Sequence, residues 1–437
     1  MPAERPGISV IVPTFNRCEH LAATLASLAA QTLPRDRFEV IVCDDGSTDD
    51  TYEVCLRFRD ELRLRYRYQE DLGFRAAAAR NGGARVAAAE VLLFLDTGTL
   101  AGPDLLAGHL AAHEAAPPAG LAVAGYTYCY HPYGSPPGLA GLLEAHSPAE
   151  VVRRHGEDAA FQDWRHDELV RLGFDLGRHG LPWIMFWSMN CSVSAREFWR
   201  AGGFCESFDR WGVEDMEFGF RLVRGGVPLA FSRRAWALES PHPRDAEGNA
   251  ASNRLNLAKL LDLHREPLIE LTWAVFTQDE IWPLETDHRE LVEWTARARG
   301  LRVRDELERA AEELRDVPPG RIAVFGCGDD VPAALAGAVL FDFDEEVVGR
   351  LNASGLEARA AIGLRVALPA ESMAAVVVTS RLSGLADRWA GRIAEEARRV
   401  GGRLWTASGR APGPVAGAVA GAVAGAVDAH GTHGGQV

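Results

Sequence analysis

The segment ISVIVPTFNRCEHLAATLASLAAQTLPRDRFEVIVCDDGS, residues Ile8–Ser47, decides the fold class. It begins and ends with short apolar runs that are typical of buried strands. Between these runs, Leu21, Leu25 and Leu28 recur at the spacing of one helical face. A strand, a helix and a second strand in this order predict an α/β fold, in which helices cover a sheet.

The same alternation continues along the chain. LRLRYRYQ (62–69) has the pattern of an edge strand, and AAAARNGGARVAAAE (76–90) that of a helix. EVLLFLD (90–96) follows as a buried strand that ends at an acidic residue. The first half of the chain is therefore predicted to build one larger sheet.

Polar residues follow three of these strands, in residues 13–17, in residues 44–47 and at Asp96. Ligands of open α/β sheets gather at the carboxyl ends of the strands, so we expect these residues to meet at one pocket. The DDGS turn has two interpretations: a carboxylate there can accept hydrogen bonds from a nucleobase or ribose, or Asp44, Asp45 and Ser47 cap the next helix.

The rest of the chain divides by its pattern. Residues 122–187 are irregular and rich in Pro, Gly and aromatic residues, which is typical of loops that set specificity. We predict four parts: a mixed-sheet α/β domain over 1–254, a helical segment over 255–316, a small Rossmann-like α/β domain over 320–409 and a disordered low-complexity tail over 410–437.

The Rossmann-like domain has an incomplete dinucleotide fingerprint. Gly326 and Gly328 supply two of its glycines, and Val331 stands where the third is expected. A structural or oligomerisation role and nucleotide binding are both open for this domain, and a homo-oligomer is one arrangement that it allows.

Composition narrows the function classes. The formal net charge of −15 argues against nucleic acid or anionic lipid as a partner, because both are recognised by basic patches. The chain shows no run of roughly 20 apolar residues, as a membrane helix requires, and its first residues lack the pattern of a signal peptide. We therefore expect a cytoplasmic protein without a membrane partner.

Five motifs occur in a recognisable order: IVPTFNR, VCDDGSTDDT, ARN, FLDTGT and GGF…WGVEDMEFGFRL. In this order they resemble the family 2 glycosyltransferases of the GT-A fold, over most of residues 1–254. The resemblance implies an inverting transfer of a sugar from a nucleotide diphosphate donor, usually with a divalent metal on the diphosphate.

The resemblance assigns donor-binding roles to five residues. It places Pro13 and Thr14 in the nucleotide pocket and Asp45 at the uracil edge. Arg80 resembles the arginine of the family that faces the base or the phosphates. Asp96 matches the first acid of the D-x-D motif, which reaches the ribose and the metal.

The last motif carries the chemistry. Asp215 matches the catalytic base of the family, Glu214 its neighbour that orients the acceptor, and Trp211 an aromatic residue near the sugar. Without the other motifs, EDMEF reads as an acidic first turn that favours the helix dipole. Trp187 is a second candidate platform for the acceptor, although a large aromatic residue is often part of the core.

The metal site departs from the family pattern. Gly98 stands where the second acid of D-x-D is expected, which leaves Asp96 and, by resemblance, His242 as ligands. A hard cation such as Mg²⁺ or Mn²⁺ takes further oxygen ligands from phosphates and water. We therefore predict a metal site that is weakened by Gly98 and still able to bind.

Together with the resemblance, these features predict an inverting, non-processive enzyme. It moves a hexose, with glucose as the preferred candidate, from a UDP-sugar to a hydroxyl group of a small hydrophilic acceptor. Processive relatives carry a Q-x-x-R-W motif that this sequence lacks, and the DTG variant resembles antibiotic-tailoring members, whose acceptors include aminocyclitol precursors. The alternatives are a cytoplasmic glycosyltransferase of surface polysaccharide synthesis and a pseudoenzyme that binds a nucleotide sugar.

Overall fold

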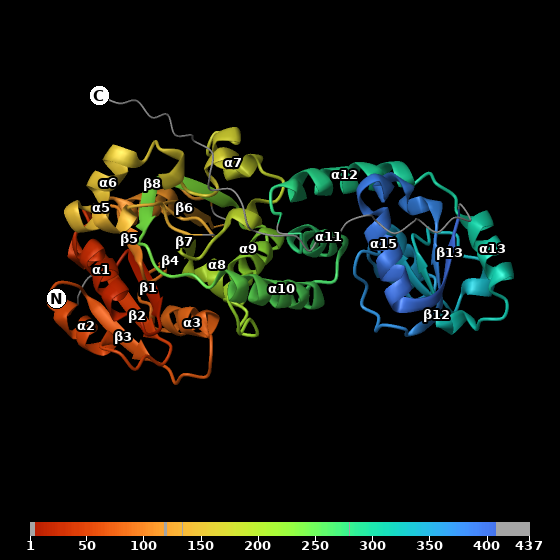
Figure 1. The fold of residues 1–437 in the computed structure, drawn as a ribbon, viewed down its shortest axis with the longest axis horizontal. Helices are drawn as coiled ribbons and strands as arrows, with labels where there is room; N and C mark the ends of the chain where they lie inside the picture. Colours follow the sequence, from red (N-terminus) through yellow and green to blue (C-terminus); the bar gives the residue numbers. More distant parts are fainter. Residues whose placement is uncertain (1–4, 118–119, 133, 279, 408–437) are drawn as a thin grey trace, which may run out of the picture. The chain divides into compact units, whose positions relative to one another are not determined.

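The computed structural model describes residues 5–117, 120–132, 134–278 and 280–407. Contacts divide the chain into two compact units, shown in Figure 1. The N-terminal unit comprises Met1–His264 and Thr272–Arg289, and the C-terminal unit comprises Arg265–Leu271 and Glu290–Val437. The domain limits expected from the sequence stay a prediction, and the tail over 410–437 lies outside the described residues.

The described part of the N-terminal unit contains a mixed sheet of eight strands in the order β3-β2-β1-β4-β7-β6-β8-β5. Strands β1, β2, β3 and β4 pair in parallel, whereas β7 pairs antiparallel to both β4 and β6. The predicted mixed α/β sheet is confirmed. The strands are β1 (Ile8–Thr14), β2 (Phe38–Asp44), β3 (Leu64–Tyr68), β4 (Val91–Leu95), β5 (Thr99–Ala101), β6 (Ala122–Tyr128), β7 (Asn190–Ser194) and β8 (Leu229–Glu239).

The helices of this unit pack on the sheet through apolar faces. The predicted face of the first helix is correct, since Leu21, Leu25 and Leu28 are buried in one cluster with β1 and β2. The helices are α1 (Cys18–Ala29), α2 (Thr51–Phe58), α3 (Ala76–Val86), α4 (Leu105–Glu114), α5 (Leu139–Ala145), α6 (Pro148–His155), α7 (His166–Arg171), α8 (Ala195–Arg200), α9 (Glu214–Arg224) and α10 (Ala246–Leu263); α11 (Pro267–Phe276) and α12 (Pro283–Ala298) contribute to both units.

The segment expected to be irregular holds one of the central strands. β6 lies between β7 and β8, and its residues Ala122 to Thr127 are buried. The sequence pattern missed this strand because its pairing partners lie far along the chain, from Leu229 to Leu238 and from Cys191 to Val193. Only tertiary pairing turns this short run of small residues into a strand.

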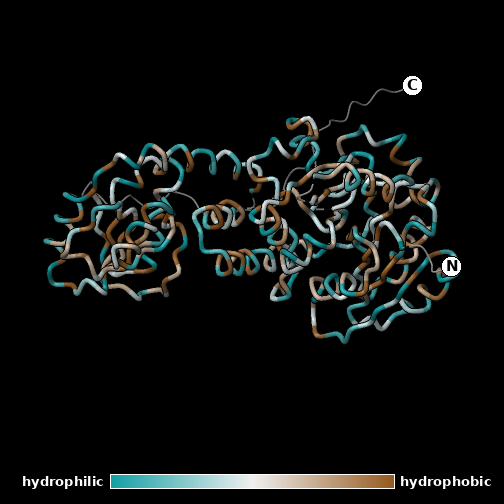
Figure 2. The backbone as a smooth tube through the Cα atoms, turned by 180° about the vertical axis from the view of Figure 1, so that it is seen from behind, coloured by the Kyte–Doolittle hydropathy of each residue, from teal (hydrophilic) through white to brown (hydrophobic). Residues whose placement is uncertain are grey.

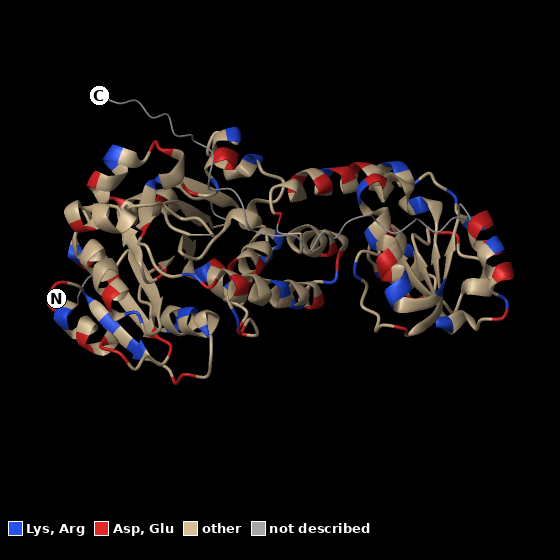
Figure 3. Cartoon of the chain, in the orientation of Figure 1, with Lys and Arg blue, Asp and Glu red and all other residues tan. Residues whose placement is uncertain are grey.

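Hydrophobic and hydrophilic stretches alternate along the backbone in both units (Figure 2). Acidic and basic residues are interspersed over both (Figure 3).

The described part of the C-terminal unit contains a parallel sheet of five strands in the order β11-β10-β9-β12-β13. This order has its switch point between β9 and β12, as a Rossmann-like sheet does. The elements are α13 (Arg304–Glu313), β9 (Ile322–Phe325), β10 (Val339–Asp342), α14 (Glu345–Ala353), β11 (Ala358–Ala360), β12 (Met373–Val378), α15 (Ala386–Val400) and β13 (Gly401–Thr406).

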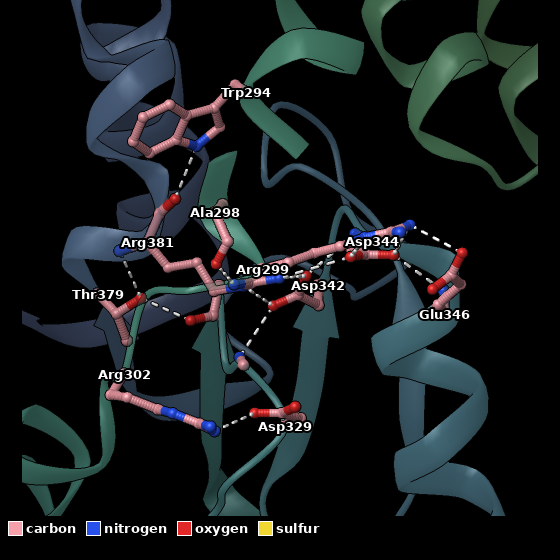
Figure 4. A network of polar contacts seen from close by, with 12 residues as sticks. Trp294, Ala298, Arg299, Arg302, Asp329, Asp342, Asp344, Glu346, Thr379 and Arg381 are labelled. Atoms are coloured by element: carbon pink, nitrogen blue, oxygen red, sulfur yellow. Dashed lines mark hydrogen bonds and ion pairs between the residues drawn. The ribbon is translucent and has the colours of Figure 1, made fainter. Parts of the chain in front are cut away.

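The switch point of this sheet is filled by the protein's own side chains (Figure 4). Asp342, at the end of β10, accepts hydrogen bonds from Arg381 Nε at 2.8 Å and from the Gly328 amide at 2.9 Å. Arg381 is buried and also donates to the carbonyl of Ala298. A short 3₁₀ helix, Ala333–Leu335, stands where a nucleotide-binding fold places a long helix. This arrangement favours the structural interpretation of the domain over dinucleotide binding.

Candidate active site

One pocket of about 900 Å³ in the N-terminal unit lies at the carboxyl ends of β1, β2 and β4. The expected convergence of the strand ends is therefore correct. All ten residues that the sequence singled out line this pocket: Pro13, Thr14, Asp45, Arg80, Asp96, Trp187, Trp211, Glu214, Asp215 and His242.

The two acids of the DDGS turn have different surroundings. Asp44 accepts hydrogen bonds from the Ser47 amide at 2.8 Å and from Tyr66 Oη at 2.6 Å, so its carboxylate stabilises the turn. Helix α2 begins later, at Thr51, and its N-terminal flank Asp50 makes no capping hydrogen bond. The helix-capping interpretation of this turn is therefore wrong.

Asp45 lines the pocket with a fixed carboxylate. Gln69 Nε2 donates to Oδ1 at 2.6 Å, and the Arg75 amide donates to Oδ2 at 2.8 Å. Burial raises the pKa of this carboxyl group, while Gln69 and Arg75 oppose the shift. Each oxygen keeps a second lone pair for a further donor, such as the imide N–H of a uracil base.

Arg80 connects the two ends of the site. From α3, its Nη2 donates to Asp96 Oδ1 at 2.9 Å and its Nη1 to Glu214 Oε1 at 3.0 Å. Its side chain is only 4% exposed and lies over the ring of Phe204. The family resemblance directs this arginine to the base or the phosphates. The geometry instead gives it two carboxylates, so we interpret it as the strut that holds the acids in place.

The acidic pair lies at the start of α9, after an unusual turn. Gly212 and Val213 both have left-handed backbone conformations, with φ of +96° and +76°. A β-branched residue rarely adopts positive φ, and such strain often occurs at functional sites. The turn places Glu214 and Asp215 in the first helical turn, facing the pocket.

The two acids are held differently. Asp215 accepts hydrogen bonds from the Ser188 amide at 3.1 Å and from the Met216 amide at 2.7 Å. Burial, followed by the adjacent Glu214 carboxylate, raises the pKa of Asp215 above the ordinary aspartate range. A raised pKa suits a general base that works near neutral pH. Glu214 Oε2 is buried without a hydrogen-bond partner among the described residues, so it can accept from a ligand.

The two candidate tryptophans differ in exposure. Trp211 is 37% exposed at the pocket, which leaves a ring face for a sugar or a cyclitol. Trp187 is only 7% exposed, because the Arg165 guanidinium covers it at 4.4 Å and Trp164 stacks on it. The packing therefore favours Trp211 as the acceptor platform and gives Trp187 a supporting place in the wall.

Asp96 and His242 both line the pocket and carry a carboxylate and an imidazole, which are ligand types that divalent cations accept. The Nδ1 of His242 lies 3.2 Å from the Ser240 carbonyl, which can only accept, so Nε2 keeps a lone pair. Burial lowers the pKa of His242 to about 4, so the ring is neutral, as a metal ligand must be. The Asp96 carboxylate is 36% exposed and uses one oxygen for Arg80.

Gly98 is required by the backbone of the turn after β4. It has φ of +94°, its amide donates to Thr24 Oγ1 at 2.9 Å, and its carbonyl accepts from both the amide and the hydroxyl of Ser240. A Cβ atom here would lie 3.2 Å from Ser240 Oγ. The missing second acid thus follows from a glycine conformation that joins this turn to the end of β8.

A second group of possible ligands lies elsewhere in the described chain. Glu168, His179 and Glu285 have ligand atoms within 4.8 Å of one another. The Leu181 amide donates to His179 Nδ1, so the neutral ring carries its proton on Nε2 and has no lone pair for a metal. Arg171 pairs with both glutamates, and we interpret this group as a structural ion-pair network.

A further acid of the pocket, Glu239 at the end of β8, was not expected from the sequence. Arg244 Nη2 binds both of its oxygens, at 2.6 and 2.7 Å. Burial raises the pKa of Glu239 to about 7, and Arg244 opposes the shift. The signal was an acid at a strand end with an arginine five positions later, which is too common a pattern to single out.

Known proteins are similar to this chain in sequence. Residues 9–165 match the family model described as glycosyl transferase family 2. The chain is 42% identical over 406 residues to a validoxylamine A glucosyltransferase of Streptomyces hygroscopicus subsp. jinggangensis (strain 5008), covering 90% of this chain and 95% of the relative. This chain is a family 2 glycosyltransferase. The glycosyltransferase prediction is confirmed, and the pseudoenzyme alternative is not supported.

Other similar proteins have lower sequence identity to this glycosyltransferase and cover less of its chain. Hyaluronan synthase of Pasteurella multocida is 34% identical over 227 residues, which cover 50% of this chain and 23% of that protein. Among solved structures, TarS 1–349 of S. aureus in complex with UDP-GlcNAc has 19% identity and a TM-score of 0.41, covering 61% of this chain and 70% of that one. Within the described residues, none of the helices combines the length and the apolar character needed to cross a bilayer.

Proposed function

We propose that this glycosyltransferase moves glucose from UDP-glucose to a hydroxyl group of validoxylamine A or a closely similar aminocyclitol, with inversion at the anomeric carbon. The observation that carries the proposal is the pocket in which Arg80 joins the donor-side acid Asp96 to the acid pair at the start of α9. The name and the near-complete coverage of the 42% identical relative support the choice of donor sugar and acceptor. A cytoplasmic location, a homo-oligomer and a role in antibiotic biosynthesis belong to the same proposal.

The chemistry follows from the residue types. Asp215 takes the proton of the acceptor hydroxyl while the oxygen attacks the anomeric carbon from the face opposite the diphosphate. The bond from that carbon to the diphosphate oxygen breaks, and its electron pair leaves with UDP. A divalent metal held by Asp96 and His242 would neutralise the charge that develops on the leaving diphosphate. Glu214, fixed by Arg80, offers its free oxygen to orient the acceptor.

The direct test is UDP release by the purified protein from a panel of UDP-sugars, with validoxylamine A as acceptor and Mn²⁺ or Mg²⁺ present. We expect release with UDP-glucose that depends on the acceptor and is lost in Asp215→Asn. An oligosaccharide acceptor forms the second arm, and turnover with it alone would favour the polysaccharide alternative. No transfer to either acceptor would contradict the proposal.

We expect Asp45→Ala to weaken UDP binding by roughly 1 to 3 kcal/mol, because a buried donor of the base loses its acceptor. Calorimetric titration with UDP measures the change. Asp44→Asn is the informative comparison, because Asp44 holds the turn through Ser47 and Tyr66 and should affect folding stability more than affinity. Unchanged UDP affinity in Asp45→Ala would remove Asp45 from the donor site.

The pH dependence of transfer should reveal the base. A general base acts only when deprotonated, and the pKa of Asp215 lies above the ordinary value of about 3.9. We therefore expect kcat/KM to fall as the pH drops through this raised pKa, while the Asp215→Asn variant loses that limb of the profile. A rate that stays constant down to the ordinary aspartate range would contradict the assignment.

Metal dependence can be separated from backbone strain at Gly98. We expect a chelator to abolish transfer and Mn²⁺ to restore it. Gly98→Asp would return the missing acid, but φ of +94° disfavours any side chain, at a cost of about 1 to 2 kcal/mol. Gly98→Ala carries the same strain without the acid, so the metal concentration for half-maximal rate, compared between the two variants, isolates the carboxylate. Chelator-resistant transfer would exclude the metal role of Asp96.

A further inference from the structure

A residue of helix α10 holds the strained turn, residues 210–213, that precedes Glu214 and Asp215. The Nδ2 atom of Asn256 lies within hydrogen-bonding distance of three successive carbonyls, those of Arg210 at 3.0 Å, Trp211 at 3.3 Å and Gly212 at 2.6 Å, which share its two N–H donors. The Asn256 side chain is fully buried. The carboxamide of Asn256 thus contacts the backbone of three consecutive residues in the turn that leads into α9.

This turn requires an external support. Gly212 and Val213 both have positive φ, and a β-branched residue there is stable only when its surroundings determine it. The turn carries Trp211 on one side and ends at Glu214 and Asp215 on the other. A shift of the turn would therefore move the acceptor platform and the base together.

Two features keep α10 itself in place. Leu257 and Leu260 are buried, and Asp245 caps the start of the helix by accepting from the Gly248 amide. One turn along the helix from Asn256, Lys259 pairs with Asp209 at 2.9 Å and donates to the Ser207 carbonyl. Asn256 and Lys259 together fix residues 207–212 to the same helix.

We propose that Asn256 is a positioning residue of the transfer reaction: it acts through the Arg210–Gly212 backbone to hold Trp211 and Asp215 in their working geometry. The proposal rests on the proposed function of Asp215 as base. A carboxamide suits the task because its N–H groups donate to carbonyls, whereas an aspartate at this position would set a carboxylate against them. Donor binding should be separate, since Thr14, Asp45 and Asp96 lie at the carboxyl ends of β1, β2 and β4, away from α10 in the sequence.

The test compares Asn256→Asp and Asn256→Ala with Leu260→Ala, a buried apolar change one turn further along the same helix that removes no hydrogen bond to the turn. Three quantities are measured well below the melting temperature: kcat for transfer, the Kd of UDP, and hydrogen exchange of the amides in residues 212–217. We expect both Asn256 variants to lose about 100-fold in kcat, as a misplaced catalytic group does. Their UDP affinity should stay within about twofold, while exchange in the turn rises at least about tenfold.

Leu260→Ala separates positioning from stability. It should lower the melting temperature while kcat and exchange in the turn stay near the wild-type values. Wild-type kcat in Asn256→Ala, or equal losses in Leu260→Ala, would overturn the proposal. Hydrogen exchange measures the hold of Asn256 on the turn even if the acceptor is misidentified. If the wild-type enzyme transfers no glucose but exchange is faster in the Asn256 variants, the proposed function alone is rejected. If exchange in these variants is unchanged, the positioning role of Asn256 alone is rejected.

Discussion

Asp215→Asn is expected to lower the rate of transfer by a factor on the order of 100 to 10,000, the usual cost of removing a general base. The amide keeps the size of the side chain and one oxygen that can accept from the Ser188 amide, and it loses only the acceptor of the Met216 amide, so the start of α9 should keep most of its geometry. It cannot take the proton of the acceptor hydroxyl. The loss should therefore appear in kcat, with the Kd of UDP unchanged.

The control for this prediction is Asp60→Asn, an exposed acid outside the pocket that should leave the rate and the UDP affinity unchanged. Steady-state kinetics and calorimetric titration with UDP measure both variants. Near wild-type turnover in Asp215→Asn would exclude Asp215 as the base. A loss of UDP binding in this variant would instead assign Asp215 to the donor side of the pocket.

Arg80→Met should have the largest effect on stability. It removes the partner of two carboxylates, Asp96 and Glu214, while the guanidinium site is almost fully enclosed. Breaking a buried ion pair by removing one partner costs about 3 to 5 kcal/mol, because the remaining charge stays buried and unpaired. Arg80 also opposes the upward shift in the pKa of Asp215, so its loss should move the acid limb of kcat/KM to higher pH.

Chemical denaturation measures the stability change, and Arg85→Met is the matched comparison. Arg85 also lies on α3 and pairs with Glu206, but both side chains are about half exposed, so its removal should cost at most about 1 kcal/mol. Equal losses in the two variants would contradict the role of Arg80 as a buried strut. A stable Arg80→Met variant with weak UDP binding would return Arg80 to the phosphate-facing role of the family.

The sequence predicts the parts of the site that follow from local pattern. The period of the apolar residues gives the strands β1, β2 and β4, and the topology of such sheets brings Thr14, Asp45 and Asp96 to one edge. What Asp45 and Asp96 contact depends on other segments. The partners of Arg80 are 16 and 134 positions away, and no local pattern encodes those distances.

The backbone strain at Val213 and its support by Asn256 could not be predicted from the sequence, because both depend on tertiary contacts. Valine rarely adopts positive φ, so the sequence WGVED does not predict the conformation of Val213. Asn256 lies in a helix among other polar residues, so its three contacts to the turn emerge only when α10 packs beside it. The central strand β6 was missed because its place in the sheet depends on pairing with β7 and β8, which the local pattern of Ala122–Tyr128 does not reveal.

The anomeric configuration of the product is the most direct test of the displacement mechanism with Asp215 as the base. Direct displacement with Asp215 as the base inverts the anomeric carbon, so the α-linked glucose of UDP-glucose must become β-linked in the product. Proton magnetic resonance of the purified product, formed by the wild-type enzyme with the proposed acceptor, distinguishes the two configurations by the coupling of the anomeric proton. We expect a β-linked product alone, and an α-linked product would contradict direct displacement.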